Sequence, residues 1–202
     1  MTLDQLRPVA NRALDPFVTV SERLGLTPDA VSVVAMGLAV AAGGAFALGG
    51  ETPLFYLVGA VLVFLNGWLD LLDGALARRL GTASRAGDLL DHVLDRYADI
   101  VMLVGLTAGV GRWAVGLAAV TGVLMTSYLG TQAQAVGLDR VYGGLVGRAD
   151  RLALIGLAGT FAAFVTGTLA GFTVVGWLLV FFAVVGHVTA LQRFYYALRA
   201  LH

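Results

Sequence analysis

Residues 70–95 read DLLDGALARRLGTASRAGDLLDHVLD. Asp70 and Asp73 are three positions apart, and Asp91 and Asp95 are four apart, so on helices each pair faces one direction. The short connection between the pairs contains glycine, which favours two helices that are direct neighbours. We therefore expect two adjacent helices whose four carboxylates converge.

The composition around this stretch indicates a membrane protein. Of 202 residues, 58% are hydrophobic and 13% are charged, whereas soluble domains carry about a quarter charged residues. A soluble domain of this size could not bury so much apolar surface. We expect a single all-α integral membrane domain over 1–202. The net charge of zero argues against a nucleic-acid partner, and the absence of cysteine excludes thiolate metal sites and disulfides.

Apolar stretches long enough for transmembrane helices succeed one another along the chain, since a crossing helix needs about 20 residues. They lie roughly at 31–49, 53–72, 95–110, 113–136, 152–168 and 172–192. They predict a six-helix bundle over 31–192. Residues 1–24 space apolar side chains three and four apart, which predicts an amphipathic helix. It either lies on the membrane surface or packs against the bundle, and Pro16 would kink it or end one piece of it.

Arginines indicate the orientation, because cytoplasmic loops are enriched in basic residues. Only Arg112 falls in a connection on the other side. The remaining loop and terminal arginines flank the spans on one side, at 7, 12, 23, 78, 79, 85, 140, 148, 151, 193 and 199. We expect a multi-pass protein of the cytoplasmic membrane, with the termini, the charged connections 74–94 and 137–151, and the carboxylates at the cytoplasmic side.

Four carboxylates at membrane depth require compensation, since each costs about 2.5–3.5 kcal/mol at a helix centre on insertion scales. Divalent cations such as Mg²⁺ or Mn²⁺ prefer carboxylate oxygens, and two ions can serve one phosphoryl displacement. Alternatives are salt bridges in a solvated loop, a divalent-cation transporter and a non-catalytic scaffold. Transporters usually hold their ligands near the midplane on broken helices, whereas these acids cluster near one membrane boundary.

The acids belong to a longer pattern, D-x2-D-G-x2-A-R-x8-G-x3-D-x3-D, which resembles the signature of the CDP-alcohol phosphatidyltransferases. The resemblance extends to chain length, to the six-helix layout and to Thr27-Pro28-Asp29 before the first span. It implies metal-dependent transfer of a lipid phosphoryl group from a CDP-linked lipid to an alcohol, with release of CMP. Relatives are commonly homodimers.

The resemblance also implies residue roles. Asp70, Asp73, Asp91 and Asp95 would bind two metal ions, and Asp95 would also be the general base. Binding of the CDP-lipid is implied for Asp29, Ser32, Gly74, Ala77, Arg78, Ser84 and Gly87. We expect Asp99 to pair locally with Arg96 and His92 to have a structural role.

The identity of the acceptor alcohol is inferred from weaker resemblances. Arg148, Arg151 and the pattern Gln192-Arg193 resemble the enzymes that make phosphatidylinositol phosphate or archaetidylinositol phosphate, so the three arginines would bind the phosphate of inositol phosphate. Relatives that use this acceptor tend to have basic residues after the Ser-Tyr of span four. Here none of the six residues after Ser127-Tyr128 is basic. Glycerol phosphate and an uncharged alcohol remain alternative acceptors.

Overall fold

The computed structural model describes residues 7–138 and 146–201, which form seven helices and no β-strand. This confirms the all-helical prediction. Arg140 and the first six residues of the expected N-terminal helix lie outside the described residues. The helices are α1 (Arg7–Arg23), α2 (Pro28–Leu48), α3 (Leu54–Leu80), α4 (Arg85–Val110), α5 (Trp113–Ala135), α6 (Arg148–Phe164) and α7 (Val174–Leu201).

Each of the six predicted spans coincides with one helix, but the helices differ in how well they suit a membrane. Among the described residues, α2, α3, α5 and α7 are long and apolar enough to cross. Helix α6 has 17 residues, and α4 carries Asp95, Arg96 and Asp99 within its more apolar part. Four spans are therefore supported by length and composition, and the six-span count stays a prediction.

The charged connection expected at 74–94 is helical except at 81–84. Helix α3 continues to Leu80 because alanine, leucine and arginine all favour helix, so the hydrogen-bonded ladder continues beyond the apolar segment. Gly81 ends it with a φ of +65°, a conformation that costs glycine nothing. Ser84 then caps α4 by accepting a hydrogen bond from the Gly87 N–H at 3.1 Å.

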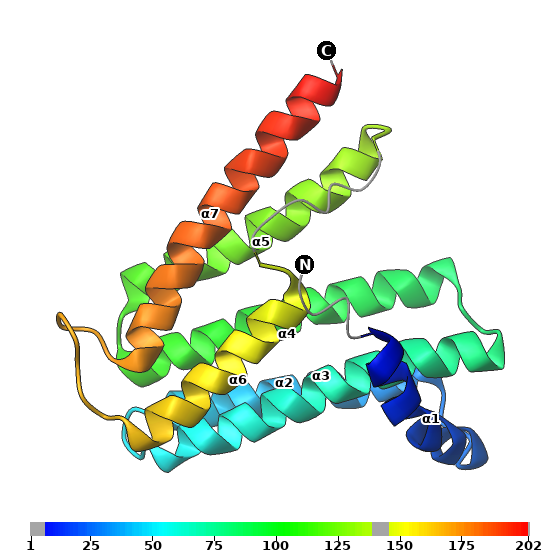
Figure 1. Ribbon diagram of the computed structural model, residues 1–202, viewed down its shortest axis with the longest axis horizontal. Helices are drawn as coiled ribbons and strands as arrows, with labels where there is room; N and C mark the ends of the chain where they lie inside the picture. Colours follow the sequence, from blue (N-terminus) through cyan, green and yellow to red (C-terminus); the bar gives the residue numbers. More distant parts are fainter. Residues whose placement is uncertain (1–6, 139–145, 202) are drawn as a thin grey trace.

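The helices form one bundle in which α2 packs against both α3 and α4, and α6 packs against α3. Helices α5 and α7 run side by side, and α5 also contacts α4 (Figure 1). Large side chains fill the centre, including Phe46, Met102 and Phe182. Glycines let backbones touch: a methyl group on Gly105 of α4 would collide with the backbone of Gly43 on α2. This close approach fixes α2 against α4 at the end remote from the carboxylates.

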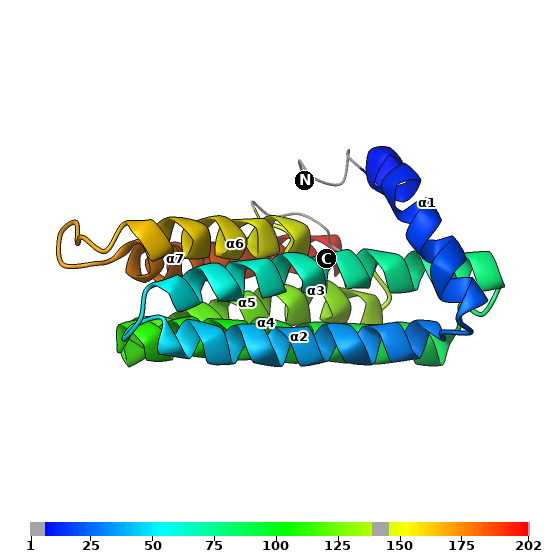
Figure 2. The ribbon, with the colours of Figure 1, turned by 90° about the horizontal axis from the view of Figure 1, so that it is seen from below.

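Helix α1 crosses the end of α3 near the α3–α4 turn (Figure 2). Leu14 and Val18 are buried against Leu72 and Leu76 of α3. Arg79 adds ion pairs to α1, at 2.9 Å to Asp15 and at 3.1 Å to Glu22. The helix continues through Pro16. Packing against the bundle, one of the two expected arrangements, is therefore present.

Candidate active site

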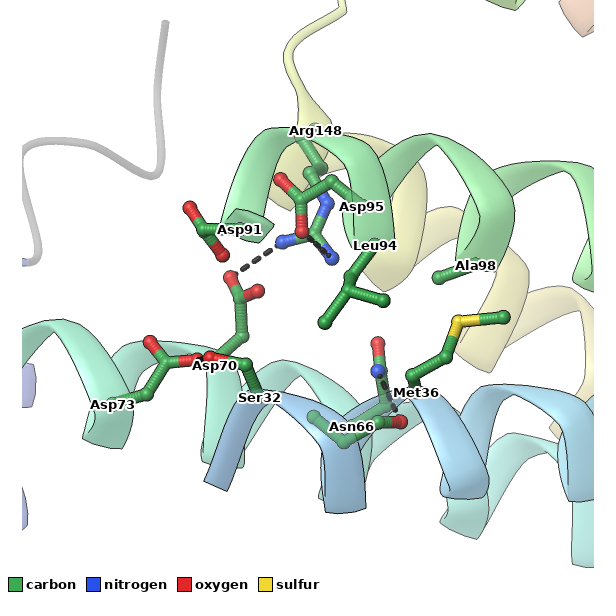
Figure 3. Close-up of a pocket in the computed structure, with 11 residues that line it drawn as sticks. Ser32, Met36, Asn66, Asp70, Asp73, Asp91, Leu94, Asp95, Ala98 and Arg148 are labelled. Carbon is green, nitrogen blue, oxygen red and sulfur yellow. Dashed lines mark hydrogen bonds and ion pairs between the residues drawn. The ribbon is translucent and has the colours of Figure 1, made fainter. Parts of the chain in front are cut away.

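Three of the four predicted metal-binding carboxylates face one another from α3 and α4, two helices that both pack against α2. Asp70, Asp91 and Asp95 each offer an oxygen atom, and these three atoms lie within 4.8 Å of one another. Figure 3 shows the three side chains converging from the two helices. The partly buried oxygen atoms form the donor set that hard divalent cations prefer, so the residues fit such an ion.

The fourth predicted ligand, Asp73, lies to the side of this group and is buried. Its Oδ2 accepts a hydrogen bond of 2.6 Å from Ser32 Oγ of α2. Ser32 was expected to contact the donor, and here it orients an acid of the signature. The role of Asp73 as a metal ligand stays a prediction.

Arg148 enters the acid group from the first turn of α6. Its guanidinium donates to Asp70 Oδ2 through Nη1 and to Asp95 Oδ1 through Nη2, the latter at 2.6 Å. This side chain thus lies between two predicted metal ligands, and its expected role at the acceptor stays a prediction. Its Nε is buried and has no hydrogen-bond partner among the described residues.

A second ionic cluster adjoins the first, one turn further along α4. Asp99 is 2% exposed and pairs with Arg151 at 2.8 Å and with Arg96 at 3.2 Å, as expected for Arg96. Arg96 also donates to Ser127 Oγ of α5. Arg193, the third predicted acceptor residue, donates from α7 to the backbone oxygen of Thr126 at 2.6 Å.

Sequence reasoning did not assign Arg96 or Ser127 to the site, although both had local signals. Arg96 directly follows the predicted base, and Ser127 opens the Ser-Tyr pair of α5. Asn66 was missed as well. It is buried, lines the same pocket as the acids, and donates to the Ala35 backbone oxygen at 2.8 Å, while its Oδ1 has no partner among the described residues.

The other residues that were predicted to bind the CDP-lipid lie outside the pocket of Figure 3. They lie at the ends of α2, α3 and α4 that are expected to face the cytoplasm. Exposed Asp29 comes near α4, since a Cβ on Gly87 would lie 3.7 Å from its Oδ1. A Cβ on Gly74 would lie 3.4 Å from Arg78 Nη1. Arg78 and Ser84 are exposed and Ala77 is partly buried. These positions form an open surface beside the acids.

His92 contacts the preceding turn of its own helix, α4. Its Nδ1 lies 2.8 Å from the Asp88 backbone oxygen and 3.5 Å from the Asp88 carboxylate. These contacts are local to one turn of α4, and the structural role of His92 stays a prediction.

Comparisons with known proteins agree with the signature. A family model described as CDP-alcohol phosphatidyltransferase matches residues 25–189. The archaetidylinositol phosphate synthase of Methanothermobacter thermautotrophicus is 32% identical over 204 residues, which cover 98% of this chain and 95% of that protein.

Two crystal structures of Mycobacterium tuberculosis phosphatidylinositol phosphate synthase are similar, each with 26% identity and a TM-score of 0.79. One has CDP-DAG bound and covers 92% of this chain and 94% of that chain. The other is in complex with manganese and citrate, with coverages of 91% and 88%.

The family match extends over most of the chain and includes both acid-bearing helices. It makes this protein a transferase of phospholipid biosynthesis, so the transporter and the non-catalytic scaffold are set aside. The apolar helices agree with a multi-pass membrane enzyme. The chain belongs to the CDP-alcohol phosphatidyltransferase family.

Proposed function

We propose that this enzyme transfers the phosphatidyl or archaetidyl group of a CDP-linked lipid to a hydroxyl of inositol phosphate, with release of CMP. One observation carries the choice of acceptor: Arg96 and Arg151 share a single carboxylate beside the acid group. Their surplus positive charge suits a phosphate monoester. The names of the relatives, synthases of inositol-phosphate lipids, support the same acceptor.

In the proposed reaction Asp95 takes the proton of the acceptor hydroxyl. The acceptor oxygen forms a bond to the lipid-proximal phosphorus while the bond from that phosphorus to CMP breaks. Positioning of the two substrates supplies much of the rate. The 2.6 Å contact from Arg148 supports this role, since it holds the Asp95 side chain in one orientation.

Asp70, Asp91 and Asp95 would hold Mg²⁺ or Mn²⁺, and with Asp73 the set is proposed to bind two ions. The oxygen-only donor set supports this, as does manganese in the M. tuberculosis relative. Such ions stabilise negative charge on phosphoryl oxygens. Binding of the CDP moiety is proposed for Asp29, Ser32, Gly74, Ala77, Arg78, Ser84 and Gly87, in keeping with the CDP-DAG bound to that relative.

Six membrane spans are proposed within a single domain over 1–202. Helix α4 can cross because its buried Asp99 is neutralised by two arginines, and the 17 residues of α6 reach the lower limit of about 17 for a span. Helix α1 would lie at the cytoplasmic interface, since Phe17 and Val20, and Leu24 directly after the helix, leave apolar surface exposed. The carboxylates would face the cytoplasm of a cytoplasmic-membrane homodimer.

The test is CMP release by detergent-purified protein supplied with CDP-lipid, Mg²⁺ or Mn²⁺, and inositol phosphate, glycerol phosphate or inositol. We expect the highest kcat/KM with inositol phosphate. Higher turnover of glycerol phosphate or of unphosphorylated inositol would contradict the acceptor. Asp95→Asn is expected to abolish CMP release, and activity that survives it would exclude Asp95 as the base. Diacyl and ether CDP-lipids compared in one assay identify the donor.

A further inference from the structure

Asp99 is a buried carboxylate outside the family signature, one helical turn beyond Asp95 on α4. Its Oδ2 is shared by two guanidinium groups, Arg151 Nη2 from α6 at 2.8 Å and Arg96 Nη1 from α4 at 3.2 Å. A buried charge persists only when it is paired and hydrogen-bonded. Here one acid fixes two arginines that arrive from different helices.

Arg96 contacts two carboxylates, those of Asp99 and Asp95, and Asp99 is the closer of the two. Its Nη1 bonds to Asp99 and to Ser127 Oγ of α5, and its Nη2 lies 3.7 Å from Oδ2 of Asp95, the proposed base. With Asp99 removed, Asp95 is the other carboxylate that Arg96 contacts. Asp99 therefore keeps the guanidinium directed toward α5 and prevents a closer ion pair with the base.

Arg151 is oriented by the same acid, and one of its N–H donors, at Nε, is left for a ligand. Its side chain is 7% exposed, and its Nε is buried without a hydrogen-bond partner among the described residues. An unpaired buried donor is costly, so the arrangement suits a ligand that brings an acceptor oxygen. Arg148 and Arg151, three positions apart on α6, pair with Asp95 and Asp99 of α4, which puts Arg151 one turn from the reacting group.

We propose that Asp99 is a positioning residue that orients Arg96 and Arg151 for the phosphate of the acceptor alcohol and keeps Arg96 from pairing with Asp95. The inference rests on the proposed function, because it requires a phosphorylated acceptor. Two arginines and one aspartate leave one net positive charge, whereas a phosphate monoester carries about −1.5 to −2 at neutral pH. The ligand therefore meets excess positive charge while Asp99 itself does not touch it.

The experiment compares wild type, Asp99→Asn and Asp88→Asn in steady-state CMP release, varying the acceptor and the CDP-lipid in turn. Asp88 is a matched control, because it lies on α4 but is exposed and contacts His92. We expect Asp99→Asn to raise the acceptor KM about tenfold or more and to lower kcat, with the donor KM changed less than twofold. Asp88→Asn should match wild type.

A second pair of variants separates an effect on side-chain positioning from an effect on protein stability. Arg96→Gln with Asp99→Asn removes one charge of each sign, so this double variant keeps the cluster balanced if the single variant does not fold. Relative to Arg96→Gln alone, the double variant should keep kcat within about twofold, because the arginine at 96 that would move toward Asp95 is absent from both, and it should still raise the acceptor KM through Arg151. An unchanged acceptor KM, or acceptor and donor KM values that rise in parallel, overturns the proposal.

The outcomes distinguish this inference from the proposed function. If wild type uses glycerol phosphate rather than inositol phosphate, the acceptor assignment fails, and the same increase in acceptor KM measured with glycerol phosphate supports the role of Asp99. If wild type uses only unphosphorylated alcohols, both fail. If inositol phosphate is the substrate and Asp99→Asn leaves its KM unchanged, the proposed function stands and this inference is wrong.

Discussion

Replacing Arg148 by glutamine is expected to tighten the binding of divalent metal. In the structure Arg148 bonds to Asp70 and Asp95, two of the three carboxylates that converge. An incoming cation must compete with the guanidinium for these oxygens. Glutamine is polar but shorter, and it removes the competing charge.

The size of the effect follows from the two contacts. A hydrogen bond to a charged group contributes about 1.5–3 kcal/mol, and the three side chains are only 14–24% exposed, so solvent screens the contacts only in part. A loss of about 2–3 kcal/mol on displacing the guanidinium corresponds to a decrease in the metal Kd of roughly 30- to 150-fold.

Calorimetric titration of chelator-treated protein with Mn²⁺ measures this Kd without any turnover. Arg79→Gln is the matched control, since Arg79 also forms two ion pairs, with Asp15 and Glu22, but lies away from the three acids. We expect wild-type affinity in the control. A Kd for Arg148→Gln that equals or exceeds the wild-type value would refute competition between the guanidinium and the metal.

Further substitutions test other parts of the structure. Asp91→Asn removes a carboxylate from the convergent set, so it should weaken Mn²⁺ binding in the same titration and reduce CMP release at least about 100-fold. Ser32→Ala removes the 2.6 Å hydrogen bond to Asp73 and should lower kcat/KM for the CDP-lipid about tenfold in initial-rate assays; an unchanged value would show that the bond has no functional role. Gly105→Ala introduces a methyl group against the backbone of α2 and should destabilise the folded protein by about 1–3 kcal/mol in detergent unfolding experiments, whereas Gly44→Ala, with open space around it, should not.

The acid-bearing helices could be predicted because their signals are local. The spacing of Asp70, Asp73, Asp91 and Asp95 sets the face of each helix, and a glycine marks the turn. The extent of the helices was harder to predict: residues 74–80 and 85–94 are rich in charge and were assigned to a connection. Their helix-forming side chains extend α3 and α4 beyond the apolar segments.

The cationic part of the site could not be predicted in detail. Arg148 meets Asp70 across 78 positions, and spacing within one helix says nothing about contacts between helices. An arginine at the start of α6 was also already accounted for by the positive-inside rule. For the same reason the pairing of Asp73 with Ser32, 41 positions apart, was not foreseen, although both residues were singled out.

The contact between Gly43 and Gly105 has a mechanical consequence for the metal site. Gly105 is ten positions from Asp95, a helical distance of about 15 Å. A rotation of α4 about the glycine contact therefore displaces Asp95. A tilt of α4 by about 5° at the glycine contact moves the carboxylate by about 1.3 Å over that distance. Metal–oxygen distances differ among divalent ions by only a few tenths of an ångström, for example about 2.0–2.1 Å for Mg²⁺ and 2.3–2.6 Å for Ca²⁺. The contact between two glycines at the other end of α4 thus affects the spacing of the three carboxylates, and Gly105→Ala should alter the ratio of Mg²⁺ to Mn²⁺ affinity even where the protein remains folded.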